Sequence, residues 1–325
     1  MKDNKKKLSW WQKLLSIIFA CILGIVSTCC LIILIFNLAK FAIYGDYFSI
    51  REVVCTNHGL NNNYVSQGTA ITDDGKYIIT SGYMSDKTSS RIYITEVETD
   101  KTHFVKLKLS ENKDAKYHFG GVAVANDTIY LANGNAVFTL SLKESLNNDT
   151  MIITKIMDVN NAASFIFTSN NYLYVGEFYD EGYSDTINHT ISYNNKNYHA
   201  IVEQYPLSNL NELTSVYAIR NKVQGFALNE NGDILLSTSY GLDSSNFYYY
   251  KSQNIIDTKQ TYLDAPLYVL EEENLKLVGP AMSEDLDYLN GKFYTNFESS
   301  SNKYVFGKLF NYSDKIVSLD FSKIV

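Results

Sequence analysis

Two closely spaced carboxylates are the first residues in this chain that could do chemistry. Asp285 and Asp287 follow Glu284 in the stretch MSEDLDYLNGKFY, and a spacing of two places both aspartates on one side of an extended strand. Like charges so close together repel, and a bound cation or a raised pKa would relieve them. Hard oxygen ligands favour Ca²⁺ or Mg²⁺. We therefore expect a metal site at these three residues, with Ca²⁺ as the candidate cofactor. The alternative is that water in an open channel hydrates both aspartates.

Other polar residues stand where predicted strands begin or end, and a ligand-binding face would collect them. They are Gln67, His118, Glu177, Gln224, Glu284 and Glu298. Two facing carboxylates can serve as acid and base in glycoside hydrolysis, and the three glutamates are candidates for such a pair. The repeated glutamines have a structural alternative, because an amide can bridge backbone groups of neighbouring repeats. The histidine has the same alternative, as a hydrogen-bonded structural residue.

Strands must position these side chains, and an internal repeat predicts where the strands lie. The phrase QGTAITDDGKYIITSGY at residues 67–83 returns as QGFALNENGDILLSTSY at residues 224–240. Each copy predicts an inner strand, a turn at Asp-Gly or Asn-Gly, and a second strand. Weaker copies lie at residues 120–132, 163–175 and 284–295. Five inner strands are therefore expected to begin near residues 67, 120, 163, 224 and 284.

A second hairpin follows each of the first four copies, so a repeat has four strands, as a β-propeller blade does. In the fourth repeat, residues 266–270 and 275–279 are expected to form this second pair. The fifth repeat ends one strand short. Residues 49–56 are expected to complete it by pairing with residues 315–321, because an unpaired edge is a liability. The sequence thus predicts an all-β fold, a β-propeller with five four-stranded blades.

Two alternatives to five blades remain at this point. Six blades would result if the long stretches after residues 178 and 241 hide extra strands, and a β-sandwich is the other all-β solution. With five blades, residues 179–199 and 241–265 become long loops on the face that collects the polar residues. They contain the aromatic stretches YDEGYSD and NFYYYK, and long loops on one rim usually serve binding. Small residues such as Gly68 and Gly225 are expected where inner strands crowd near the axis.

The N-terminal part of the chain is expected to cross a membrane. Residues 14–39 form a run of 26 residues without a charge, about 39 Å as a helix and longer than the roughly 30 Å hydrocarbon core. Six lysines against one acid in residues 1–40 predict a cytoplasmic N-terminus. A cleaved signal peptide is the alternative, but its apolar region is normally about 7–15 residues long. The predicted divisions are a basic cytoplasmic tail at 1–13, a transmembrane helix at 14–39, a juxtamembrane linker at 40–48, and an extracytoplasmic propeller domain at 49–325.

The composition of the external domain argues against one class of partner. Residues 41–325 hold 22 basic and 34 acidic residues, a net charge of −12, which argues against nucleic acid. Cys55 is the only cysteine outside the apolar run, so this domain is predicted to lack an internal disulfide. The sequence contains no nucleophile elbow, phosphate-binding loop or HExxH motif.

The strand starts QGxA, GGVA and MSED resemble those of extracytoplasmic β-propellers of the YVTN type and of the gluconolactonase and strictosidine-synthase type. The resemblance covers residues 47–325 and lies in the repeat texture. It implies a calcium ion at the mouth of the central channel, held by Glu, Asn and Asp side chains of inner strands. The matching positions here are Gln67, Gly120, Ala163, Gln224 and Glu284. Among these five, only Glu284 is a charged oxygen ligand.

These observations favour a membrane-anchored module that binds an extracytoplasmic ligand or protein on the loop-rich face of a propeller. The alternative is a cation-dependent hydrolase of a lactone, ester or glycan. A metal ringed by carboxylates at the channel mouth would favour the enzyme, and the sequence leaves catalysis open.

Overall fold

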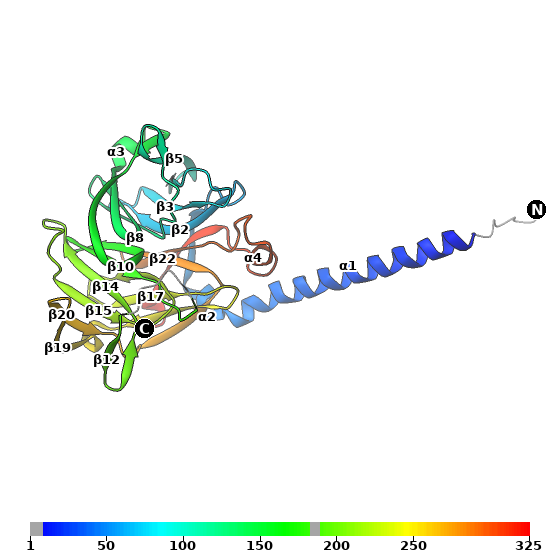
Figure 1. The fold of residues 1–325 in the computed structure, drawn as a ribbon. Helices are drawn as coiled ribbons and strands as arrows, with labels where there is room; N and C mark the ends of the chain where they lie inside the picture. The colour runs from blue at the N-terminus through cyan, green and yellow to red at the C-terminus, as the bar shows by residue number, and fades with distance from the viewer. Residues whose placement is uncertain (1–8, 183–188) are drawn as a thin grey trace, which may run out of the picture. The chain divides into compact units, whose positions relative to one another are not determined.

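The computed structural model describes residues 9–182 and 189–325, and the chain divides into two compact units, Met1–Ile43 and Tyr44–Val325 (Figure 1). The predicted basic tail lies largely, and the predicted loop at 179–199 partly, outside the described residues, at 1–8 and 183–188. Each unit is described separately below.

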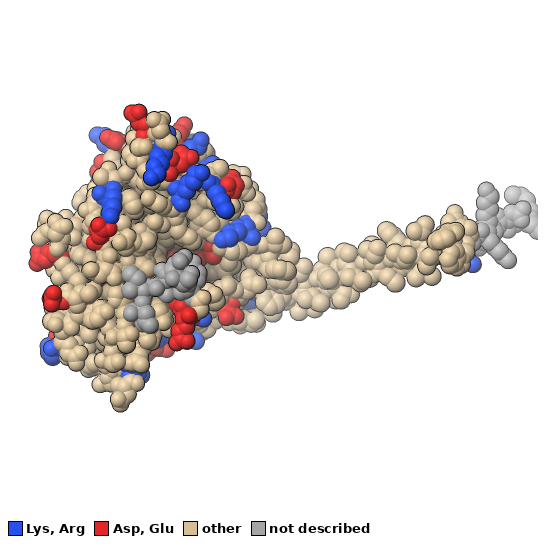
Figure 2. All heavy atoms as spheres, viewed as in Figure 1, with Lys and Arg blue, Asp and Glu red and all other residues tan. Residues whose placement is uncertain are grey.

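The first unit is a single helix, α1 (Trp10–Ile43), 34 residues long. It contains the predicted span at 14–39, and by length and composition it is apolar enough to cross a membrane. None of its residues is buried, and its visible side carries almost no charged side chains (Figure 2). An apolar helix with no protein packed around it needs another apolar environment. Residues 40–43 of the predicted linker continue this helix, and residues 45–48 belong to α2 (Gly45–Ile50) of the second unit.

The first repeat folds as one sheet with the predicted strand order. Its strands are β2 (Tyr64–Ile71), β3 (Tyr77–Met84), β4 (Arg91–Glu96), β5 (Lys101–Ser110) and β6 (Lys113–Asp114), with β9 (Thr150–Ile152) parallel to β5. Thr72 and Asp74 hold the turn between β2 and β3, because Asp74 Oδ1 accepts from the Lys76 N–H at 2.9 Å. Gly75 has a φ of +70°, a conformation that favours glycine and explains the Asp-Gly signal.

The second and third repeats are joined into one eight-stranded sheet. Its order is β19 (Ile256–Tyr262), β20 (Ala265–Val269), β15 (Ser215–Ile219), β14 (Ala200–Pro206), β11 (Tyr172–Glu177), β10 (Thr154–Ser169), β8 (Thr128–Ser141) and β7 (Gly121–Ala125). The long strand β10 makes the junction. Its first part, to Asp158, pairs with β8 as the outer strand of the second repeat, and from Ala163 it pairs with β11 as the inner strand of the third. α3 (Leu142–Ser145) follows β8, and β12 (Ile191–Tyr193) and β13 (Lys196–Tyr198) form a separate hairpin.

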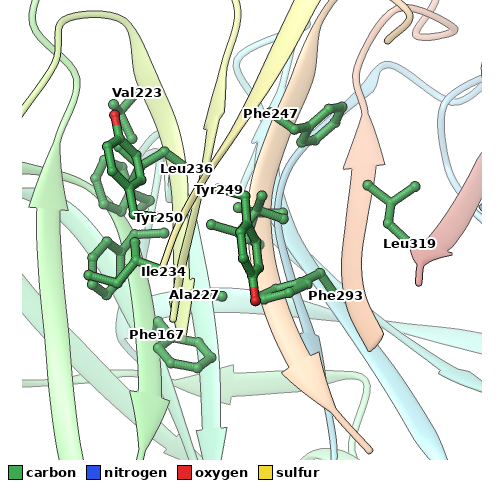
Figure 3. Close-up of a cluster of buried hydrophobic side chains, with 14 of the residues drawn as sticks. Phe167, Val223, Ala227, Ile234, Leu236, Phe247, Tyr249, Tyr250, Phe293 and Leu319 are labelled. Carbon is green, nitrogen blue, oxygen red and sulfur yellow. The ribbon is translucent and has the colours of Figure 1, made fainter. Parts of the chain in front are cut away.

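The fourth repeat corrects one strand assignment. Its sheet contains β16 (Val223–Leu228), β17 (Ile234–Thr238), β18 (Ser245–Tyr250) and β21 (Leu275–Gly279). The predicted third strand at 266–270 is wrong, because that segment is β20, which runs parallel to β15 in the neighbouring sheet. The true third strand is β18, so NFYYYK is not a loop. Its aromatic side chains pack inward: Phe247 and Tyr250 are fully buried, and the Tyr249 ring lies 6.4 Å from that of Phe293 (Figure 3).

The last sheet confirms that the two ends of the domain pair. Its order is β22 (Ser283–Leu289), β23 (Lys292–Phe297), β24 (Lys315–Leu319) and β1 (Arg51–Thr56), with α4 (Val305–Phe310) between β23 and β24. β1 is antiparallel to β24, from Arg51 opposite Leu319 to Thr56 opposite Lys315. The missing fourth strand of the fifth repeat therefore comes from residues before the first repeat, as predicted. Two short 3₁₀ turns, Ser252–Asn254 and Phe321–Lys323, complete the elements.

The five predicted inner strands contact one another in sequence. β2 lies beside β7 and β22, β7 beside β10, β10 beside β16, and β16 beside β22. The approach is close: a Cβ on Gly68 would lie 2.5 Å from the Val122 nitrogen, and one on Gly225 would lie 2.6 Å from the Leu286 nitrogen. Larger residues at these two positions would push the strands apart, so the predicted crowding of inner strands is confirmed.

Candidate functional site

The inner strands surround a cavity of about 710 Å³ at one end of the domain, and this cavity collects most of the predicted site residues. Its lining includes Gln67, His118, Gln224, Glu284 and Glu298. It also includes Tyr83 and Tyr240, which end second strands on the predicted face, and Phe178, Lys303 and Tyr304, which the sequence did not single out. Glu177 is not among the lining residues.

In four of the five inner strands a β-bulge aims a side chain into the cavity. The register shifts between Ser66 and Gly68 in β2, between Val223 and Gly225 in β16, and between Ser283 and Leu286 in β22. The residues inside these bulges include the cavity-lining Gln67, Gln224 and Glu284. An extra residue in one strand has no partner across the ladder, so its side chain turns out of the sheet. β10 repeats the pattern between Ala163 and Phe165, which places Ser164 in the lining.

Glu284 and Glu298 form a coupled pair of carboxyl groups in the cavity. Glu284 is buried at the start of β22, and Glu298 follows β23 and keeps part of its surface open. Burial raises the pKa of Glu284 well above its ordinary range, and the charges of Glu298 and Asp285 raise it further. Burial also raises the pKa of Glu298, although hydrogen bonds from Tyr304, Gln67 and Glu284 oppose this rise. The two groups therefore titrate as one pair, which still holds a proton above the ordinary glutamate pKa.

A hydrogen-bond chain connects this pair to His118. Gln67 Nε2 donates to Glu298 Oε2 at 2.6 Å, and Gln67 Oε1 lies 2.5 Å from His118 Nε2. Because the amide oxygen only accepts, His118 carries a proton on Nε2. The residue as a whole is exposed, but desolvation where it borders the cavity, helped by the charge of Lys303, lowers the pKa of His118 below its ordinary value. The histidine is therefore neutral at pH 7 and donates to the glutamine.

The cavity wall beside the carboxyl pair also contains Lys303, Tyr304 and Tyr83. The Tyr83 and Tyr304 hydroxyl groups are 3.3 Å apart, and Lys303 Nζ donates to Tyr83 and lies over both aromatic rings. The Tyr83 ring also packs on His118, with centroids 4.4 Å apart. Lys303 supplies the positive charge nearest to Glu298. Sequence reasoning missed Lys303 and Tyr304 because they lie in an irregular segment outside the strand pattern.

Glu177 has a structural environment behind the cavity wall. It is fully buried, and its two oxygens accept the Ile201 N–H at 3.0 Å and the Ala162 N–H at 3.2 Å. His189 Nε2 lies 3.2 Å from Glu177 Oε1. Burial raises the pKa of Glu177. The carboxyl group thus ties β10 to β14, while its neighbour Phe178 reaches the cavity lining.

Asp285 and Asp287 face the backbone of neighbouring inner strands. Asp287 Oδ2 accepts the Ile71 N–H at 2.6 Å, and Asp285 Oδ2 accepts the Val122 N–H at 3.1 Å. Burial raises the pKa of both aspartates well above their ordinary range. Asp285 Oδ1 is buried without a hydrogen-bond partner among the described residues, which suits a proton or a small cation.

The three acids of the predicted metal site do not come together as one ligand set. Glu284 turns into the cavity while the two aspartates bind N–H groups, and no cluster of three or more acid, His or Cys side chains suited to a metal exists among residues 9–182 and 189–325. The aspartates remain a predicted cation site, and they are separate from the carboxyl pair.

Comparison with known proteins leaves the family open. No protein-family model matches the chain, and no curated protein matches it. The PQQ-bound aldose sugar dehydrogenase of Streptomyces coelicolor is similar with a TM-score of 0.48 and 13% identity, over 83% of this chain and 96% of that one. A luciferin-regenerating enzyme gives a TM-score of 0.45 and 10% identity, over 82% of this chain and 95% of that one.

Both of those enzymes have propeller-type folds. Hydrazine synthase of Kuenenia stuttgartiensis gives a TM-score of 0.38 and 10% identity, over 72% of this chain, which spans only 55% of that protein. Scores below 0.5 at such identities are too low to transfer a ligand or a reaction. The predicted resemblance to the YVTN and gluconolactonase types therefore receives no support from a family match.

Proposed function

We propose that residues 44–325 are a membrane-tethered binding domain that holds a small neutral polar molecule in the cavity around Glu284 and Glu298. The observation that carries this proposal is the coupled carboxyl pair, which occupies a water-accessible cavity rather than a sealed core. Buried carboxyl groups cost free energy, and perturbed pairs in cavities are typical of functional sites.

The proposed scaffold is a five-bladed propeller closed by β1. Its support is the strand β1 beside β24 and the succession of contacts among the five inner strands. The strands β19 and β20 then extend the third blade rather than form a sixth, because β20 pairs with β15. Closure places the bulges of the inner strands around one axis, which is why their side chains meet in one cavity.

The proposed location is external to the cytoplasm, with α1 as an uncleaved single-pass anchor. The lysine-rich N-terminal end supports this orientation, since basic flanks stay on the cytoplasmic side. The apolar run is also longer than that of a typical signal peptide.

The ligand class follows from the charges and surfaces of the cavity. Burial raises the pKa of both glutamates, so the pair still holds at least one proton near neutral pH, and Lys303 offsets the negative charge that remains. A neutral ligand therefore fits better than an anion. The pair offers both a donor and an acceptor, and the aromatic rings of Tyr240 and Phe178, 6.2 Å apart, line the wall. Donors and acceptors beside aromatic faces suit a hydroxylated ring such as a sugar.

The test is thermal unfolding of the full chain in detergent micelles against a panel of neutral mono- and oligosaccharides. A ligand of this cavity should raise the melting temperature of the unchanged chain and lose its effect in Glu298→Gln. The matched control is Glu177→Gln, the same substitution at a buried glutamate outside the cavity, and it should keep the effect. A saccharide that stabilises Glu298→Gln as strongly as the unchanged chain binds elsewhere and contradicts the proposal.

A second candidate function is hydrolysis of an ester or lactone, and the shared proton favours it. Glu298 as carboxylate would take a proton from the attacking water, and Glu284 would give its proton to the departing alkoxide. A carboxyl pair that shares a proton can supply both the base and the acid that ester or lactone hydrolysis needs. Turnover of chromogenic esters and lactones by the unchanged chain, abolished in Glu298→Gln, would support this candidate. If the chain turns over none of these substrates, binding remains its proposed function.

A further inference from the structure

A short segment beside the cavity mouth carries exposed apolar side chains that the binding function does not use. Residues 299–313, which we call the rim segment, read SSSNKYVFGKLFNYS and contain α4. Val305 and Phe306 are 63% and 62% exposed, and Tyr312 is 52% exposed. Exposed aromatic and aliphatic side chains on consecutive positions of one segment mark an interaction surface rather than ordinary surface composition.

The charge of the rim segment contrasts with that of its domain. It contains Lys303 and Lys308 and no acidic residue, although residues 41–325 carry a net charge of −12. Basic side chains next to exposed aromatic residues are typical of segments that lie in the headgroup region of a membrane. Anionic lipid headgroups would attract the two lysines.

The route of the chain into the domain passes the same loops. Tyr44, the first residue of the second unit, has its hydroxyl 2.9 Å from Ser244 Oγ. Ser244 lies in the loop that also carries Tyr240 and the half-exposed Leu242. The Tyr47 ring packs against Phe297 at 6.2 Å, and the chain continues from there through Glu298 into the rim segment. The chain therefore enters beside the two loops that line the cavity mouth.

The chain offers no spacer that would hold these loops away from a membrane. The predicted apolar run ends at Ala39, and four residues separate it from Tyr44. Because α1 remains helical to Ile43, the five steps from Ala39 to Tyr44 span about 7.5 Å at roughly 1.5 Å each. The headgroup region on each side of a bilayer is about 5–8 Å thick. The second unit therefore begins within a few residues of the end of the predicted apolar run, with no long spacer between them.

We propose that the rim segment, with Leu242, inserts its apolar side chains into the headgroup region of the bilayer that α1 crosses, so that the cavity opens at the membrane surface. This inference rests on the proposed anchor. It also extends the proposed function: the ligand class becomes polar molecules carried at a lipid surface, such as the headgroup of a glycolipid. The partner is the lipid surface itself, and neither a second copy of the chain nor another protein is needed to cover Phe306.

The experiment places a reporter on the rim segment of the full chain in liposomes. The only tryptophans, Trp10 and Trp11, are changed to phenylalanine, and Phe306→Trp is added. The matched control is Ile152→Trp in the same background, since Ile152 is 49% exposed on β9 and lies in a different sheet. Lipids brominated near the headgroup quench a tryptophan that touches them.

The expected result is that brominated lipid removes most of the Phe306→Trp emission and leaves that of Ile152→Trp unchanged. Flotation of the liposomes separates the two proposals, because a chain that fails to float has lost the anchor itself. A chain that floats but shows equal, weak quenching at both positions overturns the rim inference alone. Phe306→Trp emission that is shifted to the blue yet unquenched at low protein-to-lipid ratio would mean a protein covers the segment, which also overturns it.

Discussion

Changing Glu298 to Gln should flatten the dependence of domain stability on pH. In the folded chain, burial raises the pKa of Glu284 and Glu298 above the 4.5 of an ordinary glutamate. Above pH 4.5 the unfolded chain has therefore lost protons that the folded pair still binds. The free energy of unfolding then falls as pH rises, until the folded pair also ionises.

The size of this effect follows from the number of protons. One extra proton on the folded state lowers the free energy of unfolding by about 1.4 kcal/mol for each pH unit. Glu298→Gln removes one titrating group and also the charge that raises the pKa of Glu284. Because the raised pKa of Glu298 is about 7, part of that proton is already lost at pH 7, and the variant should lose about 2 kcal/mol less stability than the unchanged chain between about pH 5 and 7. The buried acids Asp285, Asp287 and Glu177 remain, so some slope persists.

The assay is urea unfolding of the full chain in micelles at several pH values, followed by near-UV circular dichroism of tyrosine. Tryptophan fluorescence is unsuitable, because Trp10 and Trp11 lie on α1. Glu52→Gln is the matched control: a hydrogen bond from Lys292 lowers the pKa of Glu52, so its proton is already absent from both states above pH 5. Equal slopes in the unchanged chain and in Glu298→Gln from pH 5 to 7 would refute the coupled pair.

Three further predictions address neighbouring features. The pKa of His118 is lowered in the folded chain, so the domain loses stability as the pH falls below 6.5. His118→Gln should lose less stability than the unchanged chain over that range. Equal losses of stability below pH 6.5 in both chains contradict this prediction. Burial raises the pKa of the Cys55 thiol to about 12, and its strand β1 pairs with β24. Maleimide should therefore label Cys55 only as the domain unfolds. Rapid labelling of Cys55 in the native chain argues against closure of the propeller by β1. Millimolar Ca²⁺ should raise the melting temperature of the unchanged chain but not that of Asp285→Gly/Asp287→Ala. If Ca²⁺ does not change the melting temperature of the unchanged chain, the aspartates form no cation site.

Sequence reasoning recovered the features that local patterns encode. The Asp-Gly and Asn-Gly turns marked the hairpins, and glycines at fixed offsets marked the inner strands, because each glycine meets the backbone of a neighbouring strand. The pairing of β1 with β24 followed from a missing strand at one end of the chain and a spare one at the other. The repeated glutamine position also indicated the cavity, because the same bulge recurs in β2 and β16.

The features that it missed depend on contacts between distant segments. The tyrosine run in NFYYYK predicts a binding loop, whereas the structure buries Phe247 and pairs this segment as strand β18. The neighbour of β20 is β15, about fifty residues away and parallel, and no local pattern specifies such a pair. Likewise, Lys303 and Tyr304 reach the cavity from an irregular segment that has no sequence period, whereas Glu284 and Glu298 were predicted site residues.

The central claim is that Glu284 and Glu298 share a proton in an accessible cavity, and carboxyl ¹³C NMR of the full chain in micelles tests it most directly. Spectra of Glu284→Gln and Glu298→Gln assign the two resonances. The account predicts that both carboxyl signals shift together in one coupled titration, with a proton still bound to the pair well above the ordinary glutamate pKa of 4.5. Two independent titrations near 4.5 would contradict the account.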